Sequence, residues 1–318
     1  MNTQKKTGTA ALLAALAMTG AVTARGADVG TDYLGDPSLM VAVTGGSESR
    51  THENGSGTYG AVSYDYSIGK YEVTNAQYAK FLNAVGVTTT DNDLLLYNPE
   101  QLNYGLTWSG DQFGGDNRPV VYVSLYDAMR FVNWLTNGGT TDSDTESGLY
   151  AFSGVNTLTS TPDHATSTGW VIANQNEWYR AAYYNGEGGF WDYATQSNDH
   201  SGDRDASNGQ NSKDSGNGNV ALEAGSFIYA TSFFGTYDQG ANVCEWNEER
   251  VVRGGGFNNV ESITAYDNPA LGAANQANYI GFRVVRLMAV PEPGMVAGVL
   301  GGVALVIGVW VRRSRRTL

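Results

Sequence analysis

The sequence predicts an α+β fold: a single loop-rich domain with short strands and a few helices. Three features predict it. Helix-start signals follow short apolar segments at three places, glycine-rich strand-like segments lie near residues 251–286, and two tracts, 138–148 and 197–219, are too polar to bury. The chain has 318 residues, of which 41% are hydrophobic, so it can form a large packed core. We find no internal repeat or second domain boundary within residues 28–290.

Three helices are expected from their caps. In each, a Ser, Thr or Asn is followed three residues later by a side chain that can return the hydrogen bond, which is a capping box or its close variant. After the first two caps, apolar residues recur at helical spacing. Residues 251–257 and 281–286 are expected to be short core strands, in which glycines allow close backbone approach. The cap pairs are Thr74 with Gln77, Ser124 with Asp127, and Asn174 with Glu177.

Several segments match the sequence motifs of one known family. Residues 68–81 are I-G-K-Y-E-V-T-N-A-Q-Y-A-K-F, and residues 235–246 are G-T-Y-D-Q-G-A-N-V-C-E-W, followed by R-G-G-G-F and later by G-F-R. These segments resemble the formylglycine-generating enzyme, or sulfatase-modifying factor, family. The resemblance implies a formylglycine-generating-enzyme-like domain over residues 60–288, related in shape to C-type lectins, after an N-terminal segment at 28–59.

The resemblance also implies where catalytic cysteines should lie. Enzymes of this family use two cysteines after the glycine motif to bind copper(I), because a soft metal needs thiolates. In this chain those positions fall near Asn259 and Thr264, and Cys244 is the only cysteine. We therefore interpret Cys244 as a small buried apolar residue, do not expect copper, and expect no catalytic residue. No intrachain disulfide can form.

Oxygen-bearing side chains near the motif suggest calcium as a structural ion. Asn242 and Glu245 are three residues apart beside a glycine, and the Val243 carbonyl lies between them. Asn208, in the tract 197–219, is a further candidate ligand, although that tract is also interpreted as a solvated insertion. The three histidines, His52, His164 and His200, have no zinc-ligand spacing and are expected on loops or the surface.

The two ends are predicted to be targeting segments. Residues 1–27 have a basic start, an apolar run and small residues, as signal peptides do. Residues 289–318 contain Pro291-Glu292-Pro293, an uncharged stretch at 294–311 long enough for a transmembrane helix, and a basic tail. This order resembles a PEP-CTERM sorting signal. The resemblance implies anchoring in the inner membrane, followed by processing by an exosortase and a final location at the cell surface or outside the cell. The basic residues are Arg312, Arg313, Arg315 and Arg316.

Charge limits the possible partners. The two ends hold seven of the 19 basic residues, so the stretch 28–311 has 12 basic against 32 acidic residues and a net charge of −20. Such a surface repels phosphate backbones, so nucleic acid is not an expected partner. The preferred interpretation is an exported, envelope-associated, non-catalytic module that binds extracellular carbohydrate or exopolysaccharide. The alternatives are a formylglycine-generating oxidase acting on sulfatase cysteines and a structural matrix protein.

Overall fold

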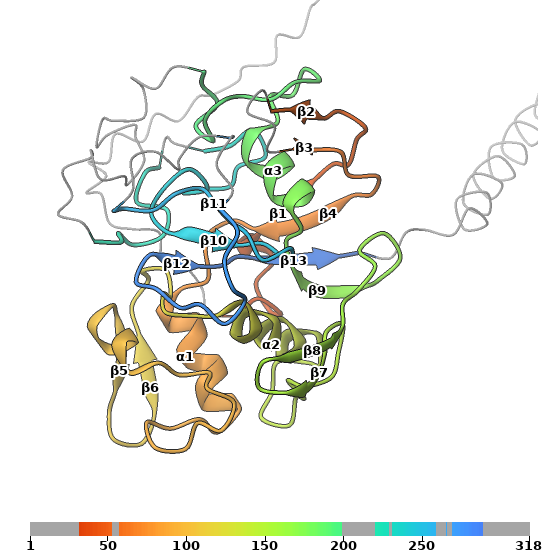
Figure 1. The fold of residues 1–318 in the computed structure, drawn as a ribbon. Coiled ribbons are helices and arrows are strands. Elements are labelled where there is room, and N and C mark those ends of the chain that lie inside the picture. The colour runs from red at the N-terminus through yellow and green to blue at the C-terminus, as the bar shows by residue number, and fades with distance from the viewer. Residues whose placement is uncertain are drawn as a thin grey trace, which may run out of the picture.

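The fold is built on a four-stranded antiparallel sheet (Figure 1). The computed structural model describes residues 32–52, 57–198, 220–228, 231–258, 265 and 269–288. The strand order is β1 (Met40–Val43), β4 (Tyr66–Gly69), β13 (Val284–Leu287) and β9 (Gly169–Ile172). The N-terminal segment thus supplies an edge strand, and the C-terminal strand lies between two much earlier ones.

Apolar residues set the register of this sheet. Ile68 pairs with Val41 on one side and with Val285 on the other, and Val285 pairs in turn with Val171. Three of these four residues, Ile68, Val171 and Val285, have no solvent exposure. A shift of one residue would turn such side chains out of the core, so burial fixes the pairing.

A second, three-stranded sheet carries the C-terminal motif. Its central strand β10 (Cys244–Trp246) pairs antiparallel with β11 (Val252–Arg253) and parallel with β12 (Ile280–Gly281). Only Phe282 and Arg283 separate β12 from β13. The G-F-R segment therefore joins the two sheets, and both of its long side chains are buried.

The three helices begin where the sequence predicts. α1 (Asn75–Ala84), α2 (Leu125–Thr136) and α3 (Gln175–Tyr183) each follow a capping box whose two hydrogen bonds are both formed. Figure 1 shows α1 and α2 on one side of the sheets and α3 on the other. The α+β, loop-rich architecture is confirmed.

Three two-stranded hairpins and two 3-10 helices complete the described chain. Each pair forms a separate two-stranded sheet. The hairpins are β2 (Arg50–Thr51) with β3 (Thr58–Tyr59), β5 (Leu106–Trp108) with β6 (Phe113–Gly115), and β7 (Ala151–Gly154) with β8 (Thr157–Ser160); the 3-10 helices are η1 (Pro37–Leu39) and η2 (Pro99–Asn103).

The glycine run differs from the predicted strand. β11 ends at Arg253, and Gly254 and Gly255 have φ angles of 90° and 69°, which glycine adopts readily and other residues do not. The predicted close backbone approach is present: a Cβ on Gly254 would lie 2.6 Å from the Gln239 carbonyl oxygen. The run is therefore a tight turn against another backbone segment, and the strand prediction for it was wrong.

Within the described residues, none of the helices is long and apolar enough to cross a membrane. The predicted signal peptide, the helix at 294–311, the motif Pro291-Glu292-Pro293 and the four tail arginines lie outside the described residues.

Candidate functional site

A buried ion pair lies at the centre of the C-terminal motif. The Arg283 guanidinium donates to both carboxylate oxygens of Glu245, at 2.6 Å each, and the Trp178 indole N–H donates to Glu245 Oε2 at 2.6 Å. Arg283 also donates to the carbonyls of Gly69 and Tyr237. Burial alone would lower the pKa of Arg283, but the Glu245 charge holds this pKa above its usual value. This pair ties α3, β4 and both sheets together.

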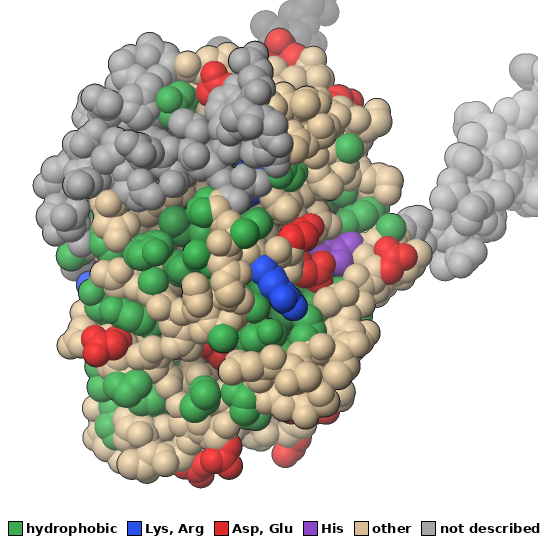
Figure 2. Space-filling model, in the orientation of Figure 1, with side chains coloured by type: hydrophobic (Ala, Val, Ile, Leu, Met, Phe, Trp, Pro, Cys, Tyr) green, Lys and Arg blue, Asp and Glu red, His purple; other side chains and the backbone are tan. Residues whose placement is uncertain are grey.

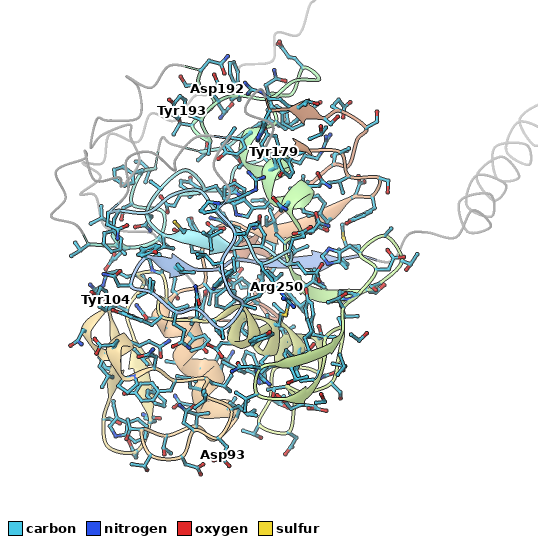
Figure 3. All side chains as sticks on the ribbon, viewed as in Figure 1. Asp93, Tyr104, Tyr179, Asp192, Tyr193 and Arg250 are labelled. Carbon is cyan, nitrogen blue, oxygen red and sulfur yellow. The ribbon has the colours of Figure 1, made fainter. Side chains whose placement is uncertain are left out.

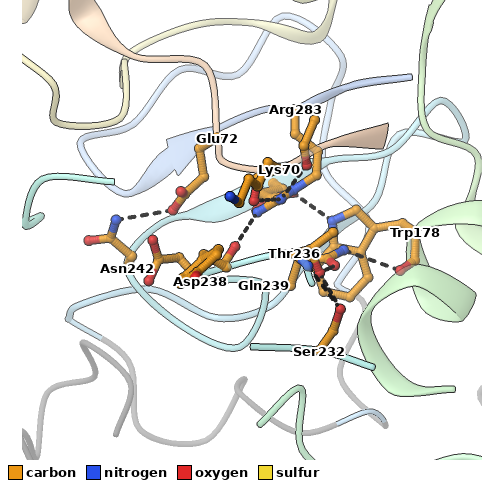
Figure 4. Close-up of polar contacts among 12 residues, drawn as sticks. Lys70, Glu72, Trp178, Ser232, Thr236, Asp238, Gln239, Asn242 and Arg283 are labelled. Atoms are coloured by element: carbon orange, nitrogen blue, oxygen red, sulfur yellow. Dashed lines mark hydrogen bonds and ion pairs between the residues drawn. The ribbon is translucent and has the colours of Figure 1, made fainter. Parts of the chain in front are cut away.

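Two further buried carboxyl groups lie beside this pair. Asn242 donates to Glu72 Oε1 at 3.0 Å, and Figure 4 shows Asp238 beside them. Glu72 Oε2 has no hydrogen-bond partner among the described residues. Burial and the nearby Asp238 charge raise the pKa of Glu72 well above its usual range, and burial raises the pKa of Asp238 to about 6. Both shifts favour the protonated form of these two carboxyl groups.

These contacts hold the segment 220–228 against the core. Asn242 accepts from the Leu222 N–H at 2.9 Å, and Asp238 accepts from the Gly225 N–H at 2.7 Å. Both Asn242 and Asp238 have positive φ angles, 63° each, a conformation that Asn and Asp tolerate better than other non-glycine residues.

The residues predicted to bind calcium do not converge on one point. Asn242 contacts Glu72 and Leu222, whereas both Glu245 oxygens accept from Arg283 and one also from Trp178. The described chain contains no group of three or more His, Cys, Asp or Glu residues placed to hold a metal ion. As they lie, these side chains do not fit a cation; the calcium prediction, including Asn208 outside the described residues, stays a prediction.

A cleft of about 330 Å³ opens next to the ion pair, on the other face of β10. Cys244 forms part of its wall and is 4% exposed. Burial, with a smaller effect of the Glu245 charge, raises the pKa of the Cys244 thiol to about 12. At neutral pH Cys244 is thus an uncharged thiol, and its predicted burial is confirmed. The lining residues are Cys244, Val252, Gly255, Asn258, Pro269, Leu271 and Tyr279.

Half-buried aromatic rings continue from the cleft. Tyr279, Tyr104 and Tyr122 all pack on a small apolar cluster that includes Val243 and Phe257. The Tyr104 and Tyr122 rings meet edge to face at 5.4 Å, and Asn278 donates to the Tyr104 hydroxyl at 3.1 Å. Figure 3 places Tyr104 beside β5 and β6, and Figure 2 shows hydrophobic side chains interspersed with polar ones on this face, with acidic side chains more evident than basic ones. We call Tyr104, Tyr122, Asn278 and Tyr279 the aromatic margin.

His52 and His164 lie in loops, as predicted, but both are buried rather than at the surface. His52 lies 3.2 Å from the Tyr179 hydroxyl, and burial lowers its pKa to about 4. His164 lies between Glu177 at 2.8 Å and Glu248 at 3.3 Å. Burial alone would lower the pKa of His164, but these two carboxylates raise it to about 10. The sequence did not reveal the pairing of His164 with Glu177 and Glu248, because the three residues lie in different segments of the chain. His200 lies outside the described residues.

Asn259 and Thr264, at the positions expected for the family's cysteines, also lie outside the described residues. Arg253, the first residue of the R-G-G-G-F motif, lies within the described residues. It donates to Gln175 at 3.1 Å, and its guanidinium lies 4.4 Å from the centre of the Tyr59 ring. Arg253 thus anchors the glycine turn to α3 and to the β2–β3 hairpin.

The fold and this site define a known family. Its model, described as the sulfatase-modifying factor enzyme 1-like domain, matches residues 27–288, and the chain belongs to this family. No curated protein sequence matches the chain.

Among the solved structures that share the fold, three have TM-scores of 0.51 to 0.53 with this chain. Treponema denticola variable protein 1 is 18% identical with a TM-score of 0.53, covering 78% of this chain and 95% of its own. CarF is 20% identical with a TM-score of 0.53, and the match covers 78% of this chain and 98% of CarF. PvdO from Pseudomonas aeruginosa is 18% identical with a TM-score of 0.51, covering 78% and 94%. At these identities the likeness concerns the fold alone.

Proposed function

We propose that this protein is an exported, envelope-associated and non-catalytic module that binds extracellular carbohydrate through the cleft beside Cys244. One observation carries the proposal: the chain's only cysteine lies in the cleft wall with a pKa of about 12. A thiol in that state is a poor nucleophile and a poor copper ligand, and no second cysteine exists to complete a pair.

The chemistry of the cleft supports a sugar ligand. Val252, Leu271 and Tyr279 offer apolar surface to the C–H faces of a sugar ring, and Asn258 offers an amide that can both donate and accept. The aromatic margin extends this surface beyond one ring. A glycan chain could therefore contact the cleft and the margin together.

The test is calorimetric titration of the protein with polysaccharide extracted from its own host's envelope. We expect saturable binding that Tyr279→Ala weakens at least about tenfold, because an aromatic contact surface is lost. Tyr193→Ala is the matched control, since Tyr193 is also half-buried but lies beyond α3, at the other end of the view from Tyr104 (Figure 3). Equal affinities of native protein and Tyr279→Ala, with both folded, would contradict the proposal. Absence of saturable binding would favour the structural matrix alternative.

Export and anchoring form a second part of the proposal. The basic, apolar and small-residue pattern of residues 1–27 supports secretion, and Pro291-Glu292-Pro293 with the following apolar and basic residues supports exosortase-type processing. Mass spectrometry of the mature protein from its host should find a C-terminus before Gly294. Recovery mainly of chains that retain Arg316 would contradict processing.

A further inference from the structure

A second pocket, of about 290 Å³, is separate from the cleft. The loop 269–279 contributes to both: Leu271 and Tyr279 line the cleft, whereas Ala274 and Gln276 line the second pocket. The remaining walls come from the chain around η2, from the start of α2, and from the β7–β8 turn at residues 155 and 156. Its size is at the lower end of the range for small-ligand sites.

A chain of polar groups links three sides of this pocket. Asn98 donates to Gln276 Oε1 at 2.5 Å, and Gln276 donates to Asp127 Oδ2 at 3.0 Å. The Ser124 N–H donates to the same Asp127 oxygen at 2.7 Å. Asp127 is 3% exposed, so the pocket contains a desolvated carboxyl group held in place by amides. The nearest cation on α2, Arg130, is instead bound bidentately by Glu146.

The rim of the pocket is formed by a strained turn. Leu95 has a φ of 57°, which is unfavourable for a non-glycine residue, and its side chain is 56% exposed. The turn is held by the Asn92 side chain, which donates to the Tyr97 carbonyl at 2.7 Å and accepts from the Tyr97 N–H at 3.0 Å. Strained backbone that presents an apolar side chain to solvent is a feature found at ligand sites.

The chemistry of the pocket selects one ligand class. An anion would be repelled by Asp127. A cation would find a single carboxylate among the described lining residues, and its Oδ2 already accepts from the Ser124 N–H and from Gln276. A neutral polyhydroxyl compound fits this lining. Its hydroxyls can donate to the Asp127 carboxylate and can exchange hydrogen bonds with the amides of Asn98, Asn156 and Gln276.

We infer that this pocket binds a single neutral sugar ring, with its hydroxyl groups on Asp127 and the amides and its C–H face against Leu95 and Val155. The inference shares the ligand class of the proposed function, but its site is a different one. A glycan could thus be held at two places on either side of the loop 269–279.

The test uses the full chain and a set of simple probes: the methyl glycosides of glucose, galactose and mannose, with glucosamine and glucuronate as charged analogues. Saturation-transfer NMR at neutral pH should detect at least one neutral glycoside. Ala274→Trp should weaken that binding at least tenfold, because Ala274 is exposed and lines the pocket. Asp127→Asn should have a similar effect through loss of a charge-assisted hydrogen bond. Asp127→Asn also alters the α2 cap, so Ala274→Trp is the variant that decides if Asp127→Asn fails to fold.

Two controls separate this pocket from other effects. Asp111→Asn removes the same charge from the exposed β5–β6 turn and should leave binding unchanged. Tyr279→Ala is measured in parallel, because the cleft is also proposed to take sugar rings. Binding that is lost in Tyr279→Ala and kept in Ala274→Trp would assign the glycoside to the cleft and overturn this inference while leaving the proposed function intact. The inference is overturned if no neutral glycoside binds, if only a charged analogue binds, or if Ala274→Trp binds as native does.

Discussion

Cys244 and Glu245 are neighbours on β10, yet they face different surroundings. Successive residues of a strand point to opposite faces. Glu245 points into the polar centre, where Arg283 and Trp178 occupy its oxygens, whereas Cys244 borders an open cleft. The Glu245 side chain joins two sheets and a helix through ionic and hydrogen-bonded contacts, whereas the Cys244 side chain packs in the hydrophobic core beside the cleft. The comparison indicates that specific polar contacts hold one face of β10 and that apolar packing holds the other.

The largest effect is expected on the Glu245 face. Glu245→Gln would remove the carboxylate that the buried Arg283 guanidinium binds, and breaking such a pair costs about 3–5 kcal/mol in the free energy of unfolding. Chemical denaturation would measure this loss. Glu187→Gln, at an exposed position, should change the free energy by less than about 0.5 kcal/mol. If the two variants had equal free energies of unfolding, the Glu245–Arg283 pair would not be important for stability.

A pH-dependent effect is expected from the carboxyl groups beside the pair. The folded-state pKa of Asp238 is raised to about 6 from 3.8. A raised carboxyl pKa contributes stability that is present below the unfolded pKa and is lost as pH rises through the folded pKa. At 1.36 kcal/mol for each pKa unit, the loss between pH 4 and pH 8 is on the order of 3 kcal/mol.

Asp238→Asn should therefore flatten this part of the stability profile, because an amide does not ionise and can still accept from the Gly225 N–H. Denaturation curves for native protein and variant at pH 5, 6, 7 and 8 would show it. A difference between the two proteins that stays constant over this range would contradict the assignment.

A smaller effect is expected on the Cys244 face. Cys244→Ala removes one buried sulfur beside a cleft, where lost packing should cost about 1 kcal/mol. Affinity for polysaccharide should stay within about twofold of native. A loss of more than about 3 kcal/mol would mean that Cys244 supports the fold as strongly as Glu245 does.

The smallest effect is expected from removing calcium. Because Asn242 and Glu245 are occupied by protein groups, a chelator should change the free energy of unfolding by less than about 1 kcal/mol, measured from melting curves. The prediction from sequence differs, since an ion at a hundredfold excess over its dissociation constant would add about 3 kcal/mol. A drop of that size, reduced in Asn242→Ala, would show that calcium replaces the contacts described here.

Sequence predicted what is local in this molecule. Each helix start rests on a cap and a residue three positions later, so Thr74, Ser124 and Asn174 could be identified directly. The burial of Cys244 followed from the apolar character of free cysteine. The fold class followed from these starts and from the family motifs.

Contacts between distant segments could not be predicted in this way. Glu245 pairs with Arg283 of the G-F-R motif. The motif identifies Arg283 as a family residue, but its sequence does not show which carboxylate it binds. His164 is buried because Glu177 and Glu248 reach it from α3 and from the turn after β10. The pocket around Asp127 needs Gln276, which lies 149 positions away in the sequence. Local patterns of apolar and polar residues do not indicate which distant residues will meet in the fold.

The central proposal is that this chain shares the family's fold without oxidising a substrate thiol in the cleft beside Cys244. The most direct test is mass spectrometry of a sulfatase-motif peptide after incubation with the protein, copper(I) and oxygen. We predict an unchanged peptide cysteine, because Cys244 is a neutral, buried thiol with no second cysteine in the chain. A formylglycine product that is formed by the native protein and abolished in Cys244→Ala would contradict the account.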